Sequence, residues 1–266
     1  MNRATVETVL ITGASSGIGL ELAKCFAAEK SNLVLVARST EALEKLAAEL
    51  RAQFQIQVVV LTADLAKPES PQWIFDEAGR AGIAVDVLVN NAGFGLQGMF
   101  NELPLARQME ILQVNQTALT ALTGLFLPGM IQRNRGGILN VGSIAGFQPG
   151  PAMALYFASK AYVQSFTEAL AAELSDTQLH VSVLCPGPTS TNFGKVARGG
   201  KVRRRKLPGM SAEAVAKYGC EKFRSRRVVI VPGWGNKMSV FIVRFIPRSL
   251  LRKLVKYFNT QIYNPE

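Results

Sequence analysis

Residues 12–19 have the sequence TGASSGIG and overlap the end of an apolar run, TVLITG at residues 8–13. The apolar run predicts a buried strand, and the residues after the glycines have the periodicity of a helix. Gly13, Gly17 and Gly19 permit a tight turn, close approach of the backbone and close packing of helix on strand. The start of such a helix offers free amide donors and a positive dipole end to a pyrophosphate. Because the spacing differs from the common G-x-G-x-x-G pattern, a glycine-rich turn without a ligand is the alternative.

The alternation of apolar runs and helical patterns continues through the first two thirds of the chain. Further strands are expected at residues 32–37, 56–64, 85–93, 136–143, 179–187 and 226–233. Strands that are apolar on both faces are typical of a parallel sheet covered by helices on both sides. The sequence therefore predicts an α/β fold, a doubly wound parallel sheet of the Rossmann type, in a single domain over residues 1–266.

Composition excludes several classes of protein. The three cysteines, Cys25, Cys185 and Cys220, stand far apart, which predicts a reduced, cytoplasmic protein with neither disulfides nor a metal site. His180 is the single histidine, so acid–base chemistry must use another side chain. No apolar run reaches the roughly 20 residues of a membrane-spanning helix, and the first residues lack the features of a secretory peptide.

The residue after the second expected strand indicates which dinucleotide would bind. This strand ends at Ala37, and Arg38 follows. An acidic residue here would bind the ribose 2′-hydroxyl of NAD, whereas an arginine suits the 2′-phosphate of NADP. Ser15 and Ser16 could add hydroxyl donors to the same phosphate. We therefore expect NADP(H) as the cofactor, with a solvated surface arginine as the alternative interpretation of Arg38.

The stretch YFASK at residues 156–160 places Tyr156 and Lys160 four residues apart, on one face of a helix. A phenol has an ordinary pKa of about 10, and a nearby cation favours the phenolate and eases release of the proton. The same spacing recurs at Tyr218 and Lys222. Spacing alone therefore does not separate a tuned acid from an ordinary helical pair.

Taken together, these motifs make the chain resemble the short-chain dehydrogenase/reductase family. The glycine-rich turn, NNAG at 90–93, Asn115 in QVNQT, Ser143 in NVGSIAG, YFASK and PGPTST at 186–191 occur in the family's order over roughly residues 5–192. Ser143 stands 13 residues before Tyr156, the family's usual gap, whereas the same count back from Tyr218 reaches Arg205 in a basic stretch. The resemblance therefore favours Tyr156 and Lys160 as the active pair.

The resemblance implies a catalytic tetrad. Tyr156 would donate a proton to the carbonyl oxygen of the substrate, and Ser143 would hydrogen-bond that oxygen. Lys160 would lower the pKa of Tyr156 and hold the nicotinamide ribose, and Asn115 would support a water that links Lys160 to solvent.

The resemblance also implies a set of cofactor contacts. Asp64 and Leu65 would hold the adenine; the NNAG segment would line the adenosine ribose or stabilise the sheet; and Thr191 would bind the carboxamide. The full expected set is Gly13, Ser15, Ser16, Gly17, Ile18, Gly19, Arg38, Asp64, Leu65, Asn91, Ala92, Gly93, Tyr156, Lys160, Pro186, Gly187 and Thr191.

The implied function is an NADPH-dependent oxidoreductase that interconverts a ketone or aldehyde and an alcohol, similar to the 3-oxoacyl and 17β-hydroxysteroid reductases of the family. A lipophilic or acyl-type substrate is expected. The alternative is a catalytically silent NADP-binding scaffold or sensor, which would be expected to have lost Ser143, Tyr156 or Lys160. A homodimer or homotetramer through helices at about 105–134 and 152–175 is also expected, because residues 152–175 are apolar on more than one face.

The last quarter of the chain is strongly basic. The net charge is +11, and residues 195–256 contain 18 basic and 2 acidic residues. A substrate-loop excursion is expected at about 192–223, with irregular backbone over 194–210, and a basic amphipathic tail at about 236–260. Arg244, Arg248, Arg252 and Lys256 recur at every fourth residue, which would form one basic stripe on a helix, although Pro247 weakens a continuous helix.

Another face of the tail would carry the apolar residues Leu250, Leu251, Leu254, Val255 and Phe258. Two interpretations of such a tail stand open. It could make peripheral contact with an anionic membrane, or it could cover the substrate cleft or a partner subunit. An acidic carrier protein would also suit the charge, and nucleic-acid binding is a weaker idea.

Overall fold

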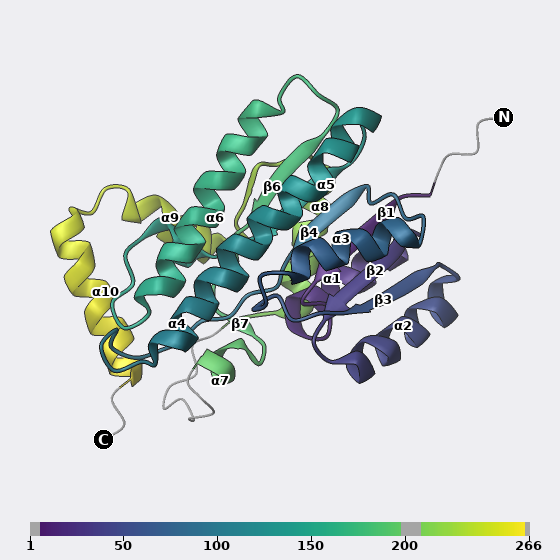
Figure 1. Cartoon of the computed structure of the whole chain (residues 1–266). Helices are drawn as coiled ribbons and strands as arrows, with labels where there is room; N and C mark the ends of the chain where they lie inside the picture. Colours follow the sequence, from purple (N-terminus) through teal and green to yellow (C-terminus); the bar gives the residue numbers. More distant parts are fainter. Residues whose placement is uncertain (1–5, 198–208, 264–266) are drawn as a thin grey trace.

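The structure is a computed structural model that describes residues 6–197 and 209–263. One parallel sheet of seven strands forms its centre, in the order β3-β2-β1-β4-β5-β6-β9 (Figure 1). The strands are β1 (Thr8–Thr12), β2 (Asn32–Ala37), β3 (Val58–Thr62), β4 (Val87–Asn90), β5 (Gly137–Val141), β6 (His180–Leu184) and β9 (Val229–Ile230). The chain builds outward from β1 to β3, then returns to place β4 beside β1 and builds the other way. This confirms the doubly wound sheet, and ligands bind such sheets where the order reverses.

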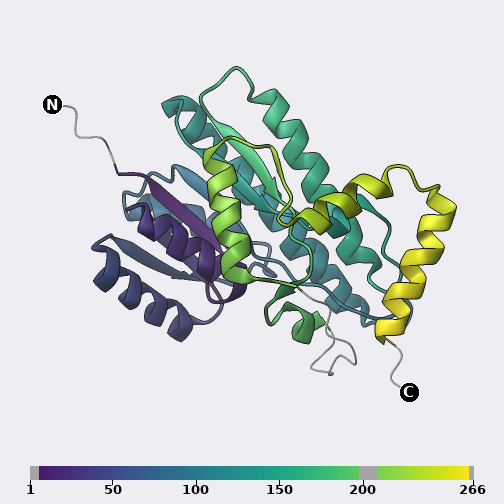
Figure 2. The same cartoon turned by 180° about the vertical axis from the view of Figure 1, so that it is seen from behind.

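Helices cover both faces of the sheet, as Figures 1 and 2 show from opposite sides. One face carries α1 (Gly17–Ala28), α2 (Thr40–Phe54) and α8 (Ala212–Arg224), and the other carries α3 (Ser70–Arg80), α5 (Leu119–Arg133) and α6 (Ala154–Glu173). Successive residues of a strand point to opposite faces. In β1, Val9 and Ile11 therefore join the core under α1, whereas Leu10 joins the core under α3 and α5.

The helix expected at residues 105–134 is present, but it is not a regular α-helix throughout. It begins as α4 (Leu105–Leu112), passes through a π-helical segment (Gln113–Ala118) and continues as α5. Such π segments widen a helix by about one residue per turn and occur often at functional sites. Asn115, an expected catalytic residue, lies inside this segment.

The segment after β6 is partly regular. Strands β7 (Thr189–Ser190) and β8 (Met210–Ser211) pair in parallel, and Phe193–Ala197 form the short helix α7. The expectation of irregular backbone from residue 194 is therefore wrong up to residue 197. Arg205 and the basic sequence KVRRRK at 201–206 lie outside the described residues.

Helix α8 follows β8 and belongs to the core rather than to a surface loop. It packs along α1, with the rings of Phe26 and Phe223 in edge contact at 6.2 Å. Phe223 is fully buried and also lies 4.2 Å from the His180 ring. The second half of the segment 192–223 thus helps to hold α1, the helix that starts at the glycine-rich turn.

The basic tail forms two helices, α9 (Trp234–Val243) and α10 (Arg248–Tyr263), which lie together at one end of the molecule (Figures 1 and 2). The chain turns at Pro247 between them, as proline requires. Arg244 ends α9, so the expected single stripe of four basic residues on one helix is wrong. Arg248, Arg252 and Lys256 share α10. Within the described residues, no helix is long and apolar enough to cross a membrane.

Replacing Phe223 by alanine should destabilise the fold by about 3–5 kcal/mol, because it opens a cavity between α1, α8 and β6. Urea unfolding followed by circular dichroism measures this loss. The matched control is Phe245→Ala, since 71% of the Phe245 side chain is exposed and its loss should cost no more than about 0.5 kcal/mol. Equal effects of the two substitutions would contradict the assignment of α8 to the core.

Candidate active site

The glycine-rich turn connects β1 to α1 and leaves the start of the helix open. Gly17 has a φ of +59°, in the left-handed region that favours glycine. A Cβ atom on Gly19 would lie 2.3 Å from the Asn91 side-chain nitrogen and 2.4 Å from the Gly13 carbonyl oxygen. The side chain of Ser16 caps no amide of α1, and the first turn holds no acidic residue. Ile18 also lies in this first turn. The glycine-rich turn and the open start of α1 together form a cradle that fits a pyrophosphate.

Hydrogen bonds join this turn to the end of β4. The Asn91 side chain donates to the carbonyl oxygens of Thr12 at 2.8 Å and Gly13 at 3.2 Å. The Thr12 hydroxyl oxygen accepts from the backbone N–H groups of Asn91 and Ala92, each at 3.0 Å. The side chain of Asn91 therefore stabilises the sheet, one of the two roles considered for NNAG.

The expected adenosine contacts follow β2 and β3 at the same edge of the sheet. Arg38 is exposed directly after β2, and Ser15 and Ser16 lie in the turn after the neighbouring β1. After β3, an oxygen of the Asp64 carboxylate accepts from the Ala66 N–H at 3.0 Å, and Leu65 is buried. The sheet thus brings these residues to one edge, as the sequence order predicts.

Ser143 and Tyr156 meet at the end of β5. Ser143 caps a short 3₁₀ helix (Ile144–Phe147), and its Oγ accepts from the Ala145 N–H at 3.1 Å. The same hydroxyl forms a hydrogen bond with Tyr156, which lies in the first turn of α6. Desolvation of the phenol raises the pKa of Tyr156 to about 12, although the hydrogen bond with Ser143 lowers it.

Lys160 lies one helical turn after Tyr156 and is almost fully buried. Its Nζ donates to the Val141 carbonyl oxygen at the end of β5, at 2.8 Å, and lies 5.9 Å from the centre of the Tyr156 ring. Burial lowers the pKa of Lys160 to about 8. Loss of hydration dominates at both groups, so the pKa of Tyr156 is raised on balance, and the group that lowers it here is Ser143.

Asn115 and Ser159 connect helix α6 to the loop after β4. The Asn115 side chain donates to the Phe94 carbonyl oxygen and to Ser159 Oγ, each at 3.0 Å, and accepts from the Phe94 N–H at 3.1 Å. Ser159 Oγ in turn donates to the Tyr156 carbonyl oxygen at 2.7 Å. A Cβ atom on Gly93 would lie 3.1 Å from Asn115 Oδ1 and 3.4 Å from Lys160 Nζ. The sequence analysis did not identify Ser159, whose small polar side chain inside YFASK was the available signal.

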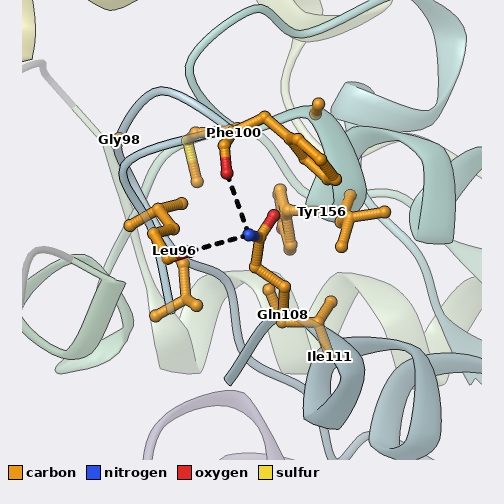
Figure 3. Close-up of a pocket in the computed structure, with 10 residues that line it drawn as sticks. Leu96, Gly98, Phe100, Gln108, Ile111 and Tyr156 are labelled. Carbon is orange, nitrogen blue, oxygen red and sulfur yellow. Dashed lines mark hydrogen bonds between the residues drawn. The ribbon is translucent and has the colours of Figure 1, made fainter. Parts of the chain in front are cut away.

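Residues 94–103 pack against the ring of Tyr156, and Gln108 holds this loop. Its side-chain nitrogen donates to the carbonyl oxygens of Phe100 and Leu103, each at 3.0 Å (Figure 3). A cavity of about 10 Å³ remains between the loop, Gln108 and Tyr156, enough for one water molecule. A Cβ atom on Gly95 would lie 3.0 Å from the Tyr156 ring, so a larger residue there would have to displace the ring slightly. Nothing in the sequence motifs identified Gly95 or Gln108.

The segment PGPTST closes the other side of the site. The Pro186 carbonyl oxygen accepts from the Ile144 N–H at 3.0 Å, next to Ser143. A Cβ atom on Gly17 would lie 3.3 Å from the Thr191 methyl group, so this segment reaches the glycine-rich turn. A Cβ atom on Gly187 would lie only 2.3 Å from the Asn236 side chain on α9. The tail therefore touches the expected nicotinamide end of the site.

The second tyrosine–lysine pair lies elsewhere in the fold, on α8. Lys222 Nζ lies 5.5 Å from the centre of the Tyr218 ring, and the same nitrogen forms an ion pair with Glu221 at 2.6 Å. This is an ordinary helical pair, as the position of Arg205 led us to expect. Burial and the nearby charges of Arg226 and Arg224 lower the pKa of His180 to about 4. Among the described residues, no cluster of His, Cys, Asp and Glu could hold a metal ion.

The family model described as short chain dehydrogenase matches residues 7–201. The chain belongs to the short-chain dehydrogenase family. It is 33% identical over 254 residues to dehydrogenase/reductase SDR family member 7B from Mus musculus, covering 92% of this chain and 79% of the relative. It is 34% identical over 195 residues to very-long-chain 3-oxoacyl-CoA reductase from Anas platyrhynchos, covering 71% of this chain and 62% of the relative.

A solved short-chain dehydrogenase from Sphingobium yanoikuyae, in complex with NADPH, has a similar structure. The TM-score is 0.81 at 34% identity, and the match covers 86% of this chain and 88% of that one. Members of the short-chain dehydrogenase family are oxidoreductases with a nicotinamide cofactor, and the cradle at the start of α1 fits the pyrophosphate of such a cofactor.

The burial of Lys160 predicts how stability depends on pH. Between pH 8 and about 10.5, the unfolded chain holds a proton that the folded protein has released, so the free energy of unfolding rises with pH. Lys160→Met removes this rise. The free energy of unfolding of the variant minus that of the unmodified protein should therefore fall as the pH rises, by at most about 1.4 kcal/mol per pH unit.

Urea unfolding at several values between pH 7 and 10 measures this difference. Tyr156 does not interfere, because its raised pKa affects stability only above about pH 10 and does so in both proteins. Lys45→Met, at an exposed lysine of α2, is the control and should give a constant difference over this range. A constant difference for Lys160→Met as well would contradict a lowered pKa.

Proposed function

We propose that this short-chain dehydrogenase is an NADPH-dependent carbonyl reductase that interconverts a ketone or aldehyde and its alcohol. The observation that carries the proposal is the convergence of Ser143, Tyr156 and Lys160 at the carboxyl end of β5. The Ser143 hydroxyl is hydrogen-bonded to Tyr156, and the Lys160 amine lies one helical turn further on, bonded to the end of the same strand. A cofactor-binding scaffold without chemistry would not need this buried polar group.

Tyr156 is proposed as the proton donor. With a pKa of about 12, its phenol is protonated throughout the neutral range, so the donor form is the populated one. Ser143 would hydrogen-bond the carbonyl oxygen of the substrate and hold it against the phenol. Its own bond to the Pro186 carbonyl is long, at 3.4 Å, and is readily exchanged for one to the substrate. NADPH, when bound, would supply the hydride to the carbonyl carbon.

Lys160 is proposed to stabilise the charge that Tyr156 carries after it has given up its proton. The Val141 carbonyl holds the amine beside the tyrosine, and a positive charge there favours the phenolate. With a pKa of about 8, Lys160 is charged at neutral pH and can also pass on a proton. Asn115, fixed to Phe94 and Ser159, would hold a water that connects Lys160 to solvent.

The cofactor contacts are proposed from their places at the edge of the sheet. The first turn of α1 would bind the pyrophosphate. Arg38, with Ser15 and Ser16, would bind the 2′-phosphate of NADP, because its exposed guanidinium is free to form two charge-assisted hydrogen bonds. Asp64 and Leu65 would hold the adenine, and Thr191 the carboxamide.

A lipophilic or acyl-type carbonyl compound is proposed as the substrate. The Tyr156 ring contacts Phe157 at 6.0 Å and Phe193 at 5.1 Å between ring centres, and Leu96 and Met153 line the small cavity beside it. Apolar side chains thus surround the proton donor. The relatives that act on 3-oxoacyl-CoA by name agree with this choice.

The homodimer or homotetramer expected from the sequence remains a proposal. Ala158, Tyr162 and Ser165 are exposed along the outer face of α6. The Tyr162 ring stacks on Phe166 at 5.8 Å, and its hydroxyl lies 2.7 Å from that of Thr120 on α5. Small residues beside a fixed aromatic ring suit close helix packing against a second copy.

Tyr156→Phe should lower turnover by about 10²–10⁴-fold and leave NADPH affinity nearly unchanged, because it removes only the donated proton. NADPH oxidation against a panel of ketones, including 3-oxoacyl thioesters, measures turnover, and fluorescence titration measures affinity. Tyr218→Phe is the matched control and should be silent. A Tyr156→Phe protein that is as active as the unmodified one would show that another group is the acid.

Arg38→Asp should shift cofactor preference from NADPH toward NADH by about tenfold or more, since it removes a phosphate partner and adds a repulsive charge. Dissociation constants for both cofactors give the ratio. Lys45→Asp, at an exposed basic residue of α2, is the control for general charge effects. An unchanged ratio in Arg38→Asp would mean that Arg38 is only a solvated surface residue.

A further inference from the structure

Helix α9 exposes an apolar stripe that the fold leaves uncovered. Its members lie three or four residues apart, on one face of the helix and the turn after it. They are Trp234, Met238, Phe241, Ile242 and Phe245, with exposed fractions of 76%, 36%, 55%, 49% and 71%. The Phe241 and Phe245 rings contact each other at 5.0 Å between centres. Apolar side chains gathered in this way mark an interaction site, whereas single exposed ones do not.

Helix α10 divides its apolar residues between the core and the solvent. Leu251 and Val255 are buried against Ala145 and Phe157, next to Tyr156. Leu250, Leu254, Tyr257 and Phe258 of the same helix remain exposed. Packing against α6 therefore buries only one row of apolar side chains on α10, and a second apolar face remains exposed to solvent.

The charge of the two helices has one sign. Residues 234–263 contain no acidic residue. Their basic residues are all exposed: Lys237, Arg244, Arg248, Arg252, Lys253 and Lys256. Exposed aromatic and aliphatic side chains beside a cluster of lysines and arginines are the composition of a surface that lies on anionic lipid. We name these exposed apolar and basic side chains of α9 and α10 the tail surface.

We infer that the tail surface docks the protein on the face of an anionic membrane. The apolar side chains would enter the boundary between headgroups and acyl chains, where Trp and Tyr are favoured, and the basic ones would contact lipid phosphates. A second copy of the chain fits this surface poorly. A two-fold contact would bring the basic residues of one copy against those of the other, and like charges face to face are costly.

Docking would place the active site next to the lipid. Leu251 and Val255 of α10 pack on Phe157 of the catalytic helix, and Asn236 of α9 lies against Gly187 in the PGPTST segment. Both helices of the tail surface thus touch the site on their inner sides. This part of the inference rests on the proposed function: the substrate would be a lipophilic carbonyl compound taken from the bilayer.

Co-sedimentation with liposomes tests the inference on the full chain. The vesicles are phosphatidylcholine alone, or phosphatidylcholine with phosphatidylglycerol, at low and high salt. We expect binding to the anionic vesicles at low salt and at least a tenfold weaker partition at high salt or without phosphatidylglycerol. Negligible binding to anionic vesicles at low salt, or equal binding to both vesicles, would overturn the inference.

Two sets of variants locate the contact. Trp234→Ser with Phe241→Ser and Phe245→Ser should weaken partition at least tenfold. The control is Trp73→Ser with Ile131→Ser, at exposed apolar residues of α3 and α5, and should bind as the unmodified protein does.

For the charges, Arg252→Glu with Lys256→Glu should weaken binding at least tenfold. Lys45→Glu with Lys217→Glu carries the same change in net charge on α2 and α8 and should have little effect. Equal losses in each variant and its control would overturn the assignment to the tail surface.

Two further measurements separate the remaining explanations. Turnover of a water-soluble ketone should be unchanged in the tail-surface variants, so a lack of turnover in every protein would count against the proposed function and not against docking. Sedimentation velocity without lipid should give the same mass for the unmodified protein and the Trp234, Phe241 and Phe245 variant. A smaller mass for the variant would show that the surface joins two copies, and would overturn the inference.

Discussion

Hydrogen bonds between Thr12 and Asn91 hold the two halves of the sheet together where the strand order reverses. The chain builds β1 to β3 on one side of this point and β4 to β9 on the other. The Asn91 side chain donates to the carbonyls of Thr12 and Gly13, and the Thr12 hydroxyl accepts two backbone N–H groups in return. The glycine-rich turn is thereby fixed relative to β4 and its loop. The relative position of the glycine-rich turn and helix α6 depends on these hydrogen bonds, because the two elements are built on opposite halves of the sheet.

The proposed catalytic side chains lie in a region where burial opposes charge. Lys160 is almost fully buried, and its hydrogen bond to the Val141 carbonyl compensates only part of the hydration that it loses. The phenol of Tyr156 stays protonated for the same reason. The loss of hydration at Lys160 is unfavourable for the folded protein, and a negative charge bound nearby would offset part of it. The large hydrophobic cores on both faces of the sheet supply the stability that this arrangement requires.

The sequence predicted the features that follow from strand order, and it missed those that depend on tertiary packing. The positions of Arg38 and Ser143 at one edge of the sheet could be predicted because each follows a strand, and parallel strands end at the same edge. The π-helical turn around Asn115 and the bridge through Ser159 have no periodic signal. The raised pKa of Tyr156 also has no signal in the sequence, because it depends on which groups desolvate the phenol. The helical periodicity of the tail predicted an apolar and a basic face. Which apolar residues of α10 would pack against α6 could not be predicted, because that depends on tertiary packing.

The most direct test of the account is to follow the transferred hydrogen. The protein is incubated with NADPH carrying deuterium at both positions of nicotinamide C4, together with a ketone from the panel, and the alcohol is analysed by mass spectrometry. The account predicts one deuterium on the carbinol carbon, and a hydroxyl hydrogen that comes through Tyr156 and exchanges with water. An alcohol without deuterium, or bound NADPH with no ketone reduced, would contradict it.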